Sequence, residues 1–465
     1  MTLIVEPPPS KTDDPARRQR DLLAYRPVAR LLRSRWYPGV FQWAAAAVFA
    51  VVVYQLMLGP ESAHDNLGTA LVWVAWWPLI PILFVALGRV WCTVCPFGKL
   101  SDLVQRLVGV QRPVPRFLKR YGIWIIDAQF ILITWGDHIW GIVESPWGTG
   151  ILLLLLVTAV VASGAFFQRR TFCRYLCFLG GLSGNYARTG ALALRANTDV
   201  CRTCTARAIC YHGGDRAPAC PLFEFPRTMD SSANCNLCAN CIKNCPNDAI
   251  ALTVRQPSSE LWFVRRPRIE ESVLAMAIMG IVLIQNVTML ELWTDLLAWI
   301  ERTTGLSSYP VIFTLVFTVA VATPLAGVWP ASLAASRRND TAALTNFARF
   351  GYALIPLDVA GHIAHNLFHL LAEGKSVLYT TLALFGRDSA GASAAIVGTP
   401  TIQVLQYVVL GVGIGASAYT AYRIARSNHA NATVRTRTLT PYLTVIALFA
   451  LANIVLFMLP MAMRM

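Results

Sequence analysis

Nine long apolar runs constrain the fold of this chain more than any other feature of its sequence. A helix that crosses the hydrocarbon core of a bilayer needs about 20 apolar residues. We place such spans at 39–58, 69–90, 122–143, 150–167, 271–290, 309–329, 350–372, 401–424 and 441–462. Charged residues make up only 14% of the chain, against about 25% in an ordinary soluble chain. The sequence therefore predicts an all-α polytopic membrane protein and excludes a soluble enzyme with a polar surface.

The loops between these runs predict the orientation of the helices. Basic residues follow the second, fourth, sixth and eighth spans, for example Arg106, Arg169, Arg337 and Arg426, whereas 59–68 has none. Because basic loops stay in the cytoplasm, we expect a multi-pass protein with a cytoplasmic N-terminus and an extracytoplasmic C-terminus. The net charge of +15 then reflects this topology, and we expect no nucleic-acid partner.

The twelve cysteines divide into one cluster of eight and two close pairs. The eight lie in an insert between the fourth and fifth spans, about 191–268, which the topology places in the cytoplasm. Thiols in that reducing compartment remain free to bind metal. The run from Cys235 to Cys245 has the spacing Cys-x2-Cys-x2-Cys-x3-Cys-Pro of bacterial two-cluster ferredoxins, in which the fourth cysteine ligates the other cluster. The insert is therefore predicted to be a small two-[4Fe–4S] ferredoxin domain.

The order of the eight cysteines predicts how the two clusters share them. A first run supplies three ligands, and Cys220, which precedes a proline as Cys245 does, supplies the crossing ligand. The alternative is a zinc ribbon built from paired Cys-x2-Cys knuckles, which two runs that each end in Cys-Pro disfavour. We expect one cluster on Cys201, Cys204, Cys210 and Cys245, and the other on Cys235, Cys238, Cys241 and Cys220.

A repeated motif surrounds the remaining four cysteines. Arg89-Val-Trp-Cys92 is similar to Arg170-Thr-Phe-Cys173, and a Gly-x-Leu-Ser segment follows the second cysteine of each pair, Cys95 and Cys177. Spans one and two, and spans three and four, are then copies of one hairpin, with all four thiols at the same membrane face. These thiols are a candidate third metal site or redox disulfide. The alternative is that they are small apolar residues at helix ends.

Together, these motifs resemble a known family. The segments Trp91-Cys-x2-Cys-Pro96 and Phe172-Cys-Arg-Tyr-Leu-Cys177, followed by the two-cluster insert, are similar to the membrane polyferredoxins of the NapH, NosR and CcoG type over residues 38–255. The resemblance implies electron transfer at the bacterial cytoplasmic membrane. Members pass electrons between quinol or cytoplasmic donors and extracytoplasmic oxidoreductases, or reduce metal for oxidase assembly. Phe178 departs from the family pattern, which has proline there.

Histidines in the later spans form a candidate second cofactor site. His362, His365 and His369 recur at helical spacing in the seventh span, one turn after Asp358. His138 lies near the outer end of the third span. Ionisable side chains within a span are costly and usually functional. We expect haem b between His138 and His365 or His369, because its two axial ligands approach from different helices. A quinone, another metal, or hydrogen bonds between helices without any ligand are the alternatives.

These observations predict four regions and one role. The regions are a basic, partly disordered cytoplasmic tail (1–37), a four-helix membrane domain (38–190), the ferredoxin domain (191–268) and a five-helix membrane domain (269–465). We expect an electron-transfer subunit of a membrane oxidoreductase system, with no catalytic residue of its own. Its partners are the lipid bilayer and either the quinone pool or a redox protein. A copper-reducing oxidase assembly factor and a redox-sensing membrane protein remain the alternatives.

Overall fold

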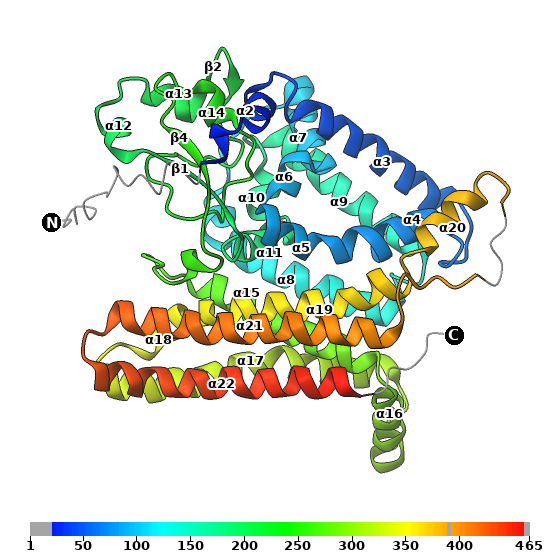
Figure 1. The fold of residues 1–465 in the computed structure, drawn as a ribbon. Coiled ribbons are helices and arrows are strands. Elements are labelled where there is room, and N and C mark those ends of the chain that lie inside the picture. Colours follow the sequence, from blue (N-terminus) through cyan, green and yellow to red (C-terminus); the bar gives the residue numbers. More distant parts are fainter. Residues whose placement is uncertain (1–20, 388–391, 460–465) are drawn as a thin grey trace.

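Long helices dominate the computed structural model, which describes residues 21–387 and 392–459 (Figure 1). The start of the expected tail (1–20) and the end of the ninth expected span (460–462) lie outside the described residues. Among the described residues, seven helices are long and apolar enough to cross a membrane. They are Gly39–Leu58 (α3), Leu67–Leu87 (α4, η2 and α5), Pro146–Phe166 (α9), Ile269–Thr288 (α15), Tyr309–Asn339 (α17), Thr399–Asn428 (α21) and Ala432–Met458 (α22). The prediction of a helical membrane protein is confirmed.

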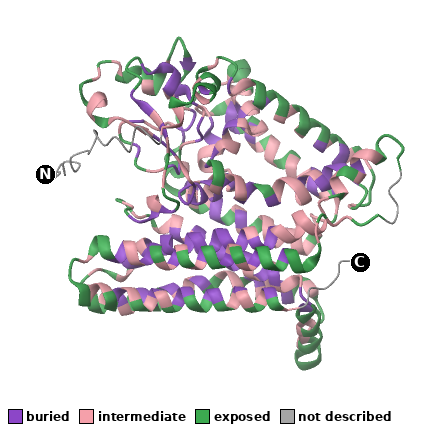
Figure 2. Cartoon of the chain, in the orientation of Figure 1, coloured by how far each residue is buried: buried purple, intermediate pink, exposed green. Residues whose placement is uncertain are grey.

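The third and seventh expected spans also form helices, but more polar ones. They correspond to α8 (Arg116–Trp140) and to α19 (Ile355–Ala372), which follows α18 (Ala343–Gly351) and the short η4 (Tyr352–Leu354). Aspartates interrupt the apolar sequence of α8, and Asp358 and three histidines interrupt that of α19. Helix α19 packs against α21, α15 and α5 and is largely buried (Figure 2). A helix enclosed by other helices needs no apolar outer face, which explains why α19 can be more polar than the seven apolar helices.

The helices after the insert form a layered bundle in which α15 is central. Helices α15, α17, α19, α21 and α22 run side by side in the lower part of Figure 1. Two thirds of the apolar stretch of α15 (67%) is buried inside the protein. Helix α16 (Glu291–Thr304) projects from the end of the bundle opposite the insert, where α20 (Ser376–Ala383) also lies (Figure 1).

The two cysteine pairs occur on equivalent local structures. Helix α5 (Trp77–Leu87) leads into the short α6 (Val90–Val94) and then α7 (Pro96–Val108), while α9 leads into the short α10 (Thr171–Tyr175) and then α11 (Phe178–Tyr186). In each copy a short helix carries the first cysteine, and the second cysteine is the N-cap of the following helix. Helix α7 also packs along α9. The repeat in the sequence is therefore a repeat in the fold.

The insert is closed by a pair of strands at its ends. Strand β1 (Leu192–Ala196) pairs antiparallel with β4 (Ile250–Val254), so the chain enters and leaves at the same place. Between them lie α12 (Thr198–Thr203), α13 (Arg207–His212), the hairpin of β2 (Gly213–Gly214) and β3 (Ala217–Pro218), and α14 (Asn240–Asn244); η3 (Ser259–Leu261) follows β4.

The described part of the expected basic tail, residues 21–37, is folded against this insert. After η1 (Leu22–Ala24), helix α2 (Arg26–Arg33) is followed by the first membrane span. Leu32 and Tyr37 pack with Leu237 and Ile242 of the insert, and the Tyr37 hydroxyl donates a hydrogen bond to the Leu237 carbonyl oxygen (2.9 Å). A few apolar residues among the arginines are enough to fold this segment against the insert.

Candidate functional site

The first group of four cysteines converges from three segments of the insert. Cys201, Cys204, Cys210 and Cys245 all line one small pocket. Helix α12 carries Cys201 and is capped by Cys204, and α13 carries Cys210; neither helix contains a buried residue. Polar hydrogens also point at the sulfurs: the Asn247 side-chain amide donates to Cys204 Sγ and the Ala249 backbone amide donates to Cys245 Sγ, each at 3.3 Å. Although residues 205–209 separate Cys210 from Cys204 along the chain, Cys210 lines the same pocket as the other three.

The second group of four cysteines is held in a tight turn. Cys235, Cys238 and Cys241 interact electrostatically with one another and with Cys220. Leu237 and Ala239, between the cysteines, have left-handed backbone conformations (φ 58° and 63°). This path directs backbone amides toward the sulfurs, including that of Leu237 toward Cys235 and that of Asn240 toward Cys238. Amides that wrap the sulfur ligands are what a cubane cluster requires, so both groups fit the sites predicted for [4Fe–4S] clusters.

The spacing of the cysteine side chains differs from that of a site for a single metal ion. Among the described residues, no group of three or more His, Cys, Asp or Glu side chains could hold one metal ion. A tetrahedral zinc site brings four sulfurs to about 2.3 Å from one ion. The thiolates around a cubane stand further apart, because each binds a different iron.

The four cysteines of the repeated pairs form a third group. Cys92, Cys95, Cys173 and Cys177, the four-thiol site, all line one large cavity. Burial, reinforced by the neighbouring thiols, raises the pKa of Cys95 to about 12. Two buried cations lie beside them: Arg89 reaches Cys92 Sγ (3.9 Å), and Arg170 interacts with Cys173. Crowded thiols become metal ligands when a cationic metal centre compensates the charge of their deprotonated form.

The second group of the insert lies directly on the four-thiol site. The Arg89 guanidinium donates to the Ala233 carbonyl oxygen, and the Thr93 hydroxyl donates to the Asn236 carbonyl oxygen. Both acceptors belong to the loop that carries Cys235 and Cys238, while Arg89 and Thr93 flank Cys92. Arg170 also interacts with both Cys173 and Cys238. The sequence predicts that the second cysteine group and the four-thiol site lie at the same membrane face, but it does not reveal the direct contact between them.

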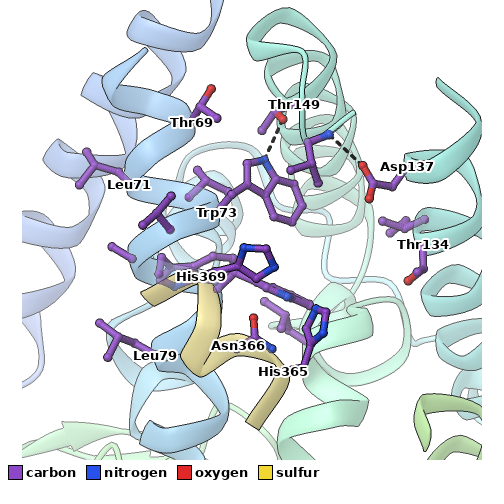
Figure 3. Close-up of a pocket in the computed structure, with 18 of the residues that line it drawn as sticks. Thr69, Leu71, Trp73, Leu79, Thr134, Asp137, Thr149, His365, Asn366 and His369 are labelled. Atoms are coloured by element: carbon purple, nitrogen blue, oxygen red, sulfur yellow. Dashed lines mark hydrogen bonds between the residues drawn. The ribbon is translucent and has the colours of Figure 1, made fainter. Parts of the chain in front are cut away.

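The cavity extends from the four-thiol site into the membrane bundle. Its volume is about 1880 Å³, and its walls come from α3, η2, α8, α9, α19 and α21. The wall at η2 (Ala70–Trp76) is a π-helical segment, a geometry that often marks functional sites, and it contributes Trp73 and Trp76. Trp73 donates its indole N–H to Thr149 Oγ1 (3.0 Å) across the cavity wall (Figure 3).

Three of the four expected histidines line this cavity. His365 and His369 point into it beside Asn366 (Figure 3), with ring centroids 5.4 Å apart. His365 Nδ1 bonds Asn286 Oδ1 (2.8 Å) and His369 Nδ1 faces a Glu373 carboxylate oxygen (3.5 Å).

His138 lines the cavity from α8 and is engaged on both sides of its ring. Its Nδ1 bonds the Thr134 carbonyl oxygen (3.1 Å), its Nε2 approaches Thr288 Oγ1 (3.4 Å), and the ring stacks on Phe313 at 4.7 Å. The ring nitrogens of His138 therefore already have hydrogen-bond partners, and an axial bond to haem would have to replace one of them.

His362 does not line the cavity. Its Nδ1 bonds the Tyr186 hydroxyl (3.0 Å), and its ring contacts Trp77 (5.8 Å between centroids). The common helical stripe of the three histidines is therefore divided between two environments. Sequence reasoning missed Tyr186, because nothing in its local pattern sets it apart. Glu373 lies one turn after His369, so the same spacing argument extended by one turn would have found it.

Comparison with known proteins agrees with this chemistry. A family described as a 4Fe-4S binding domain matches the chain twice, over residues 69–115 and 149–196. Each matched segment contains one cysteine pair of the four-thiol site. No solved structure matches the chain significantly.

Two curated relatives are similar to part of the chain. The "Putative electron transport protein YccM" of Escherichia coli is 24% identical over 247 residues, which are 48% of this chain and 65% of that protein. The "Uncharacterized protein MJ0750" of Methanocaldococcus jannaschii is 24% identical over 196 residues, which are 38% of this chain and 76% of that protein. The chain thus spans about two thirds of the first relative's length. The family match supports the predicted iron–sulfur binding, and the first relative is itself named a putative electron transport protein; neither likeness distinguishes the NapH, NosR and CcoG types.

Proposed function

We propose that this protein relays electrons along three iron–sulfur centres between its insert and a quinone in the membrane cavity. The two groups of the insert hold the first two [4Fe–4S] clusters, with the ligand sets predicted from the sequence. The four-thiol site holds a third centre. The family match described as a 4Fe-4S binding domain covers both of its cysteine pairs and not the ferredoxin run of the insert, which supports an iron–sulfur centre there.

The contact between the insert and the four-thiol site carries this proposal. Arg89 and Thr93 join the backbone of the 233–236 loop to the segment that bears Cys92. Asn236 of that loop itself lines the cavity. An electron on the second cluster would therefore have short covalent and hydrogen-bonded paths to the four-thiol site, and from there into the cavity.

A quinone suits the cavity better than haem b does. Its lining combines many aromatic and aliphatic side chains with polar ones, which include His365, His369, Asn366 and Gln406. Ligand sites of this kind combine apolar walls with a few polar groups that orient the ligand. Imidazole and amide groups suit quinone carbonyl oxygens, and the hydrogen bonds of His138 leave that ring without a free nitrogen for iron.

The cellular setting follows from the family resemblance. We place the protein in a bacterial cytoplasmic membrane, with the N-terminus and insert in the cytoplasm and the C-terminus outside, and with a redox protein as a further partner. The positions of the insert and α16 at opposite ends of the bundle (Figure 1) agree with this orientation.

Iron and sulfide analysis of anaerobically purified protein tests the number of centres. Three cubanes predict about twelve irons per chain, and Cys92→Ser/Cys173→Ser predicts about eight. The matched variant Cys235→Ser/Cys238→Ser removes two thiols from the insert and should also lose one cluster. If the first variant keeps all the iron of the wild type, the third centre does not exist.

A reduced-minus-oxidised visible spectrum and a quinone assay test the acceptor. We expect a broad iron–sulfur bleach without sharp haem α and Soret bands, and reoxidation of the reduced clusters by decylubiquinone. Sharp haem bands would replace quinone with haem b. Clusters that remain reduced in the presence of decylubiquinone but are oxidised by ferricyanide would refute a quinone site.

A further inference from the structure

Three titratable side chains lie buried in the membrane bundle without lining the cavity. They are Tyr186 at the end of α11, and Asp358 and His362 on successive turns of α19, and none is more than 2% exposed. Tyr186 contacts both others: its hydroxyl lies 3.0 Å from His362 Nδ1 and interacts with the Asp358 carboxyl. Neither carboxyl oxygen of Asp358 meets the geometry of a hydrogen bond with any described residue.

This group is suited to hold and pass a proton. Burying an ionised carboxylate is costly where only a phenol hydroxyl lies beside it, so the neutral carboxylic acid, which can donate a proton, is the form of Asp358 that this site favours. The Tyr186 hydroxyl and His362 imidazole share one hydrogen bond, in which a proton can reside on either side. Acid, phenol and imidazole chains inside membrane bundles are typical of proton relays.

Helix α11 connects this group to the four-thiol site. The helix begins after its N-cap, Cys177, and ends at Tyr186, and one turn before Tyr186 the Ser183 hydroxyl lies 3.6 Å from Cys92 Sγ. Trp77 gives a second connection, because its ring contacts both Phe178 (6.5 Å) and His362 (5.8 Å). A charge added at the four-thiol site therefore interacts electrostatically with the Tyr186–His362 pair, because only a short stretch of low-dielectric protein separates them.

Other polar residues follow Tyr186 and His362 along the chain, toward the insert face and toward the cavity. Two residues beyond Tyr186, Arg188 pairs with Glu271 of α15 (2.6 Å), whose carboxylate also accepts from Tyr352 of η4 (2.7 Å). Towards the cavity, the Asn366 amide donates to the His362 carbonyl oxygen (2.8 Å), and Asn366 lines the cavity.

The other residues packed around Asp358, Tyr186 and His362 carry few charges. Helix α8 contributes the buried carboxyl of Asp127, which interacts with Glu271. Helix α21 contributes the Ser417 hydroxyl, which accepts from the Leu357 amide, and α22 contributes the Asn453 amide beside Gly361. Helix α5 contributes the apolar face of Trp77. The titratable group nearest to Tyr186 along the insert side of the chain is thus the Arg188–Glu271 pair, and the next titratable residues after His362 on α19 are the cavity histidines His365 and His369.

We propose that Asp358, Tyr186 and His362 form a proton-transfer group that couples electron arrival at the four-thiol site to proton uptake from the insert face. This inference rests on the proposed relay, and its quinone step balances as follows. The quinone takes two electrons from the clusters and two protons through His362 and the cavity histidines, and leaves as quinol. The group is then reprotonated from the aqueous phase through Glu271.

The first test needs no quinone. Redox titrations of the full-length protein are carried out at several pH values, following the centre that Cys92→Ser/Cys173→Ser removes. Reduction should be accompanied by proton uptake, so the potential of that centre should fall as pH rises, whereas Tyr186→Phe and Asp358→Asn should flatten this dependence. Tyr442→Phe is the matched control, because Tyr442 is a buried phenol that bonds Ser332 elsewhere in the bundle (3.0 Å). A wild-type potential that does not change with pH would overturn the inference.

The second test separates this inference from the relay itself. Dithionite-reduced protein is mixed with decylubiquinone or with ferricyanide, which takes electrons without protons, and cluster reoxidation is followed by stopped-flow absorbance. Asp358→Asn and Tyr186→Phe should slow the quinone reaction by about 100-fold and leave the ferricyanide reaction and the iron content unchanged. Equal quinone rates in wild type and variants would refute the proton-transfer group. If decylubiquinone does not reoxidise the clusters of the wild-type protein, the quinone site is refuted instead. The pH dependence of the redox potential would then be the test of the proton-transfer group.

Discussion

The ion pair between Arg170 and Asp102 offers a quantitative test of how the four-thiol site is held together. Arg170 is the N-cap of α10 and has a left-handed backbone (φ 50°). Its Nε and Nη2 donate to the two carboxylate oxygens of Asp102 on α7, at 3.1 and 2.7 Å. This bidentate pair joins the two copies of the repeat, because α7 follows Cys95 and α10 carries Cys173.

The burial of the two partners predicts an unequal cost for removing each of them. The Arg170 side chain is 5% exposed and that of Asp102 is 31% exposed. Removing one partner of a buried pair costs about 3–5 kcal/mol, because the other charge remains uncompensated. Asp102→Leu leaves a buried guanidinium and should cost this full amount. Arg170→Met leaves a carboxylate that water can reach in part, so we expect a smaller loss of about 2–3 kcal/mol.

A double-mutant cycle measures this coupling directly. The variant Arg170→Met/Asp102→Leu replaces the pair with apolar side chains, and its free energy of unfolding should exceed the additive expectation by about 2 kcal/mol or more. Unfolding is followed by circular dichroism during titration of detergent-solubilised protein with dodecyl sulfate. Single variants within about 1 kcal/mol of wild type, or a double variant that is simply additive, would contradict this account of the pair.

Three further outcomes are expected. Gly413→Ala should destabilise the bundle by about 1–3 kcal/mol, because a Cβ there would overlap the Ala360 Cβ. Gly411→Ala, which meets nothing within 4 Å, should not, and unfolding in detergent compares the two variants. Arg89→Gln should slow electron transfer from the insert to the four-thiol site, since the substitution weakens the contact with the 233–236 loop. Rapid-freeze spectroscopy of cluster reduction measures this rate, and an unchanged rate argues against a route through the Arg89 contact. Burial and a nearby arginine lower the pKa of His429 from 6.5. Below pH 6.5 the unfolded chain therefore binds more protons than the folded protein, and the free energy of unfolding should fall on acidification. His429→Asn should weaken this pH dependence in unfolding titrations.

Membrane class and the helix positions could be read from the sequence because both depend on local composition. The apolar runs 39–58 and 150–167 coincide closely with α3 and α9. Helix α19 shows the limit of that reasoning: its aspartate and histidines are tolerated only because α5, α15 and α21 enclose it, and enclosure is a property of the assembled bundle.

Grouping of the cysteines was also accessible from the sequence, since ligand spacing along the chain is imposed by cluster geometry. The structure brings together the same sets of four that the spacing predicts. What local pattern could not supply were contacts between distant segments. The bond of Tyr186 to His362 joins residues 176 positions apart, and the contact of Arg89 with Ala233 joins residues 144 positions apart. Both depend on how α11 and the insert pack, and neither leaves a periodic signal.

The distribution of titratable groups along the proposed electron path has a physical reason. Helices α12 and α13 around the first group of cysteines have no buried residue, so water and ions can compensate a charge that arrives there. The cavity lies inside the bundle, where an uncompensated electron would be costly. A proton is the compensating charge that a hydrogen-bonded chain can deliver. Asp358, His362, His365 and His369 follow one another along α19 at intervals of three or four residues, which places protonatable groups where solvent can no longer screen the electron.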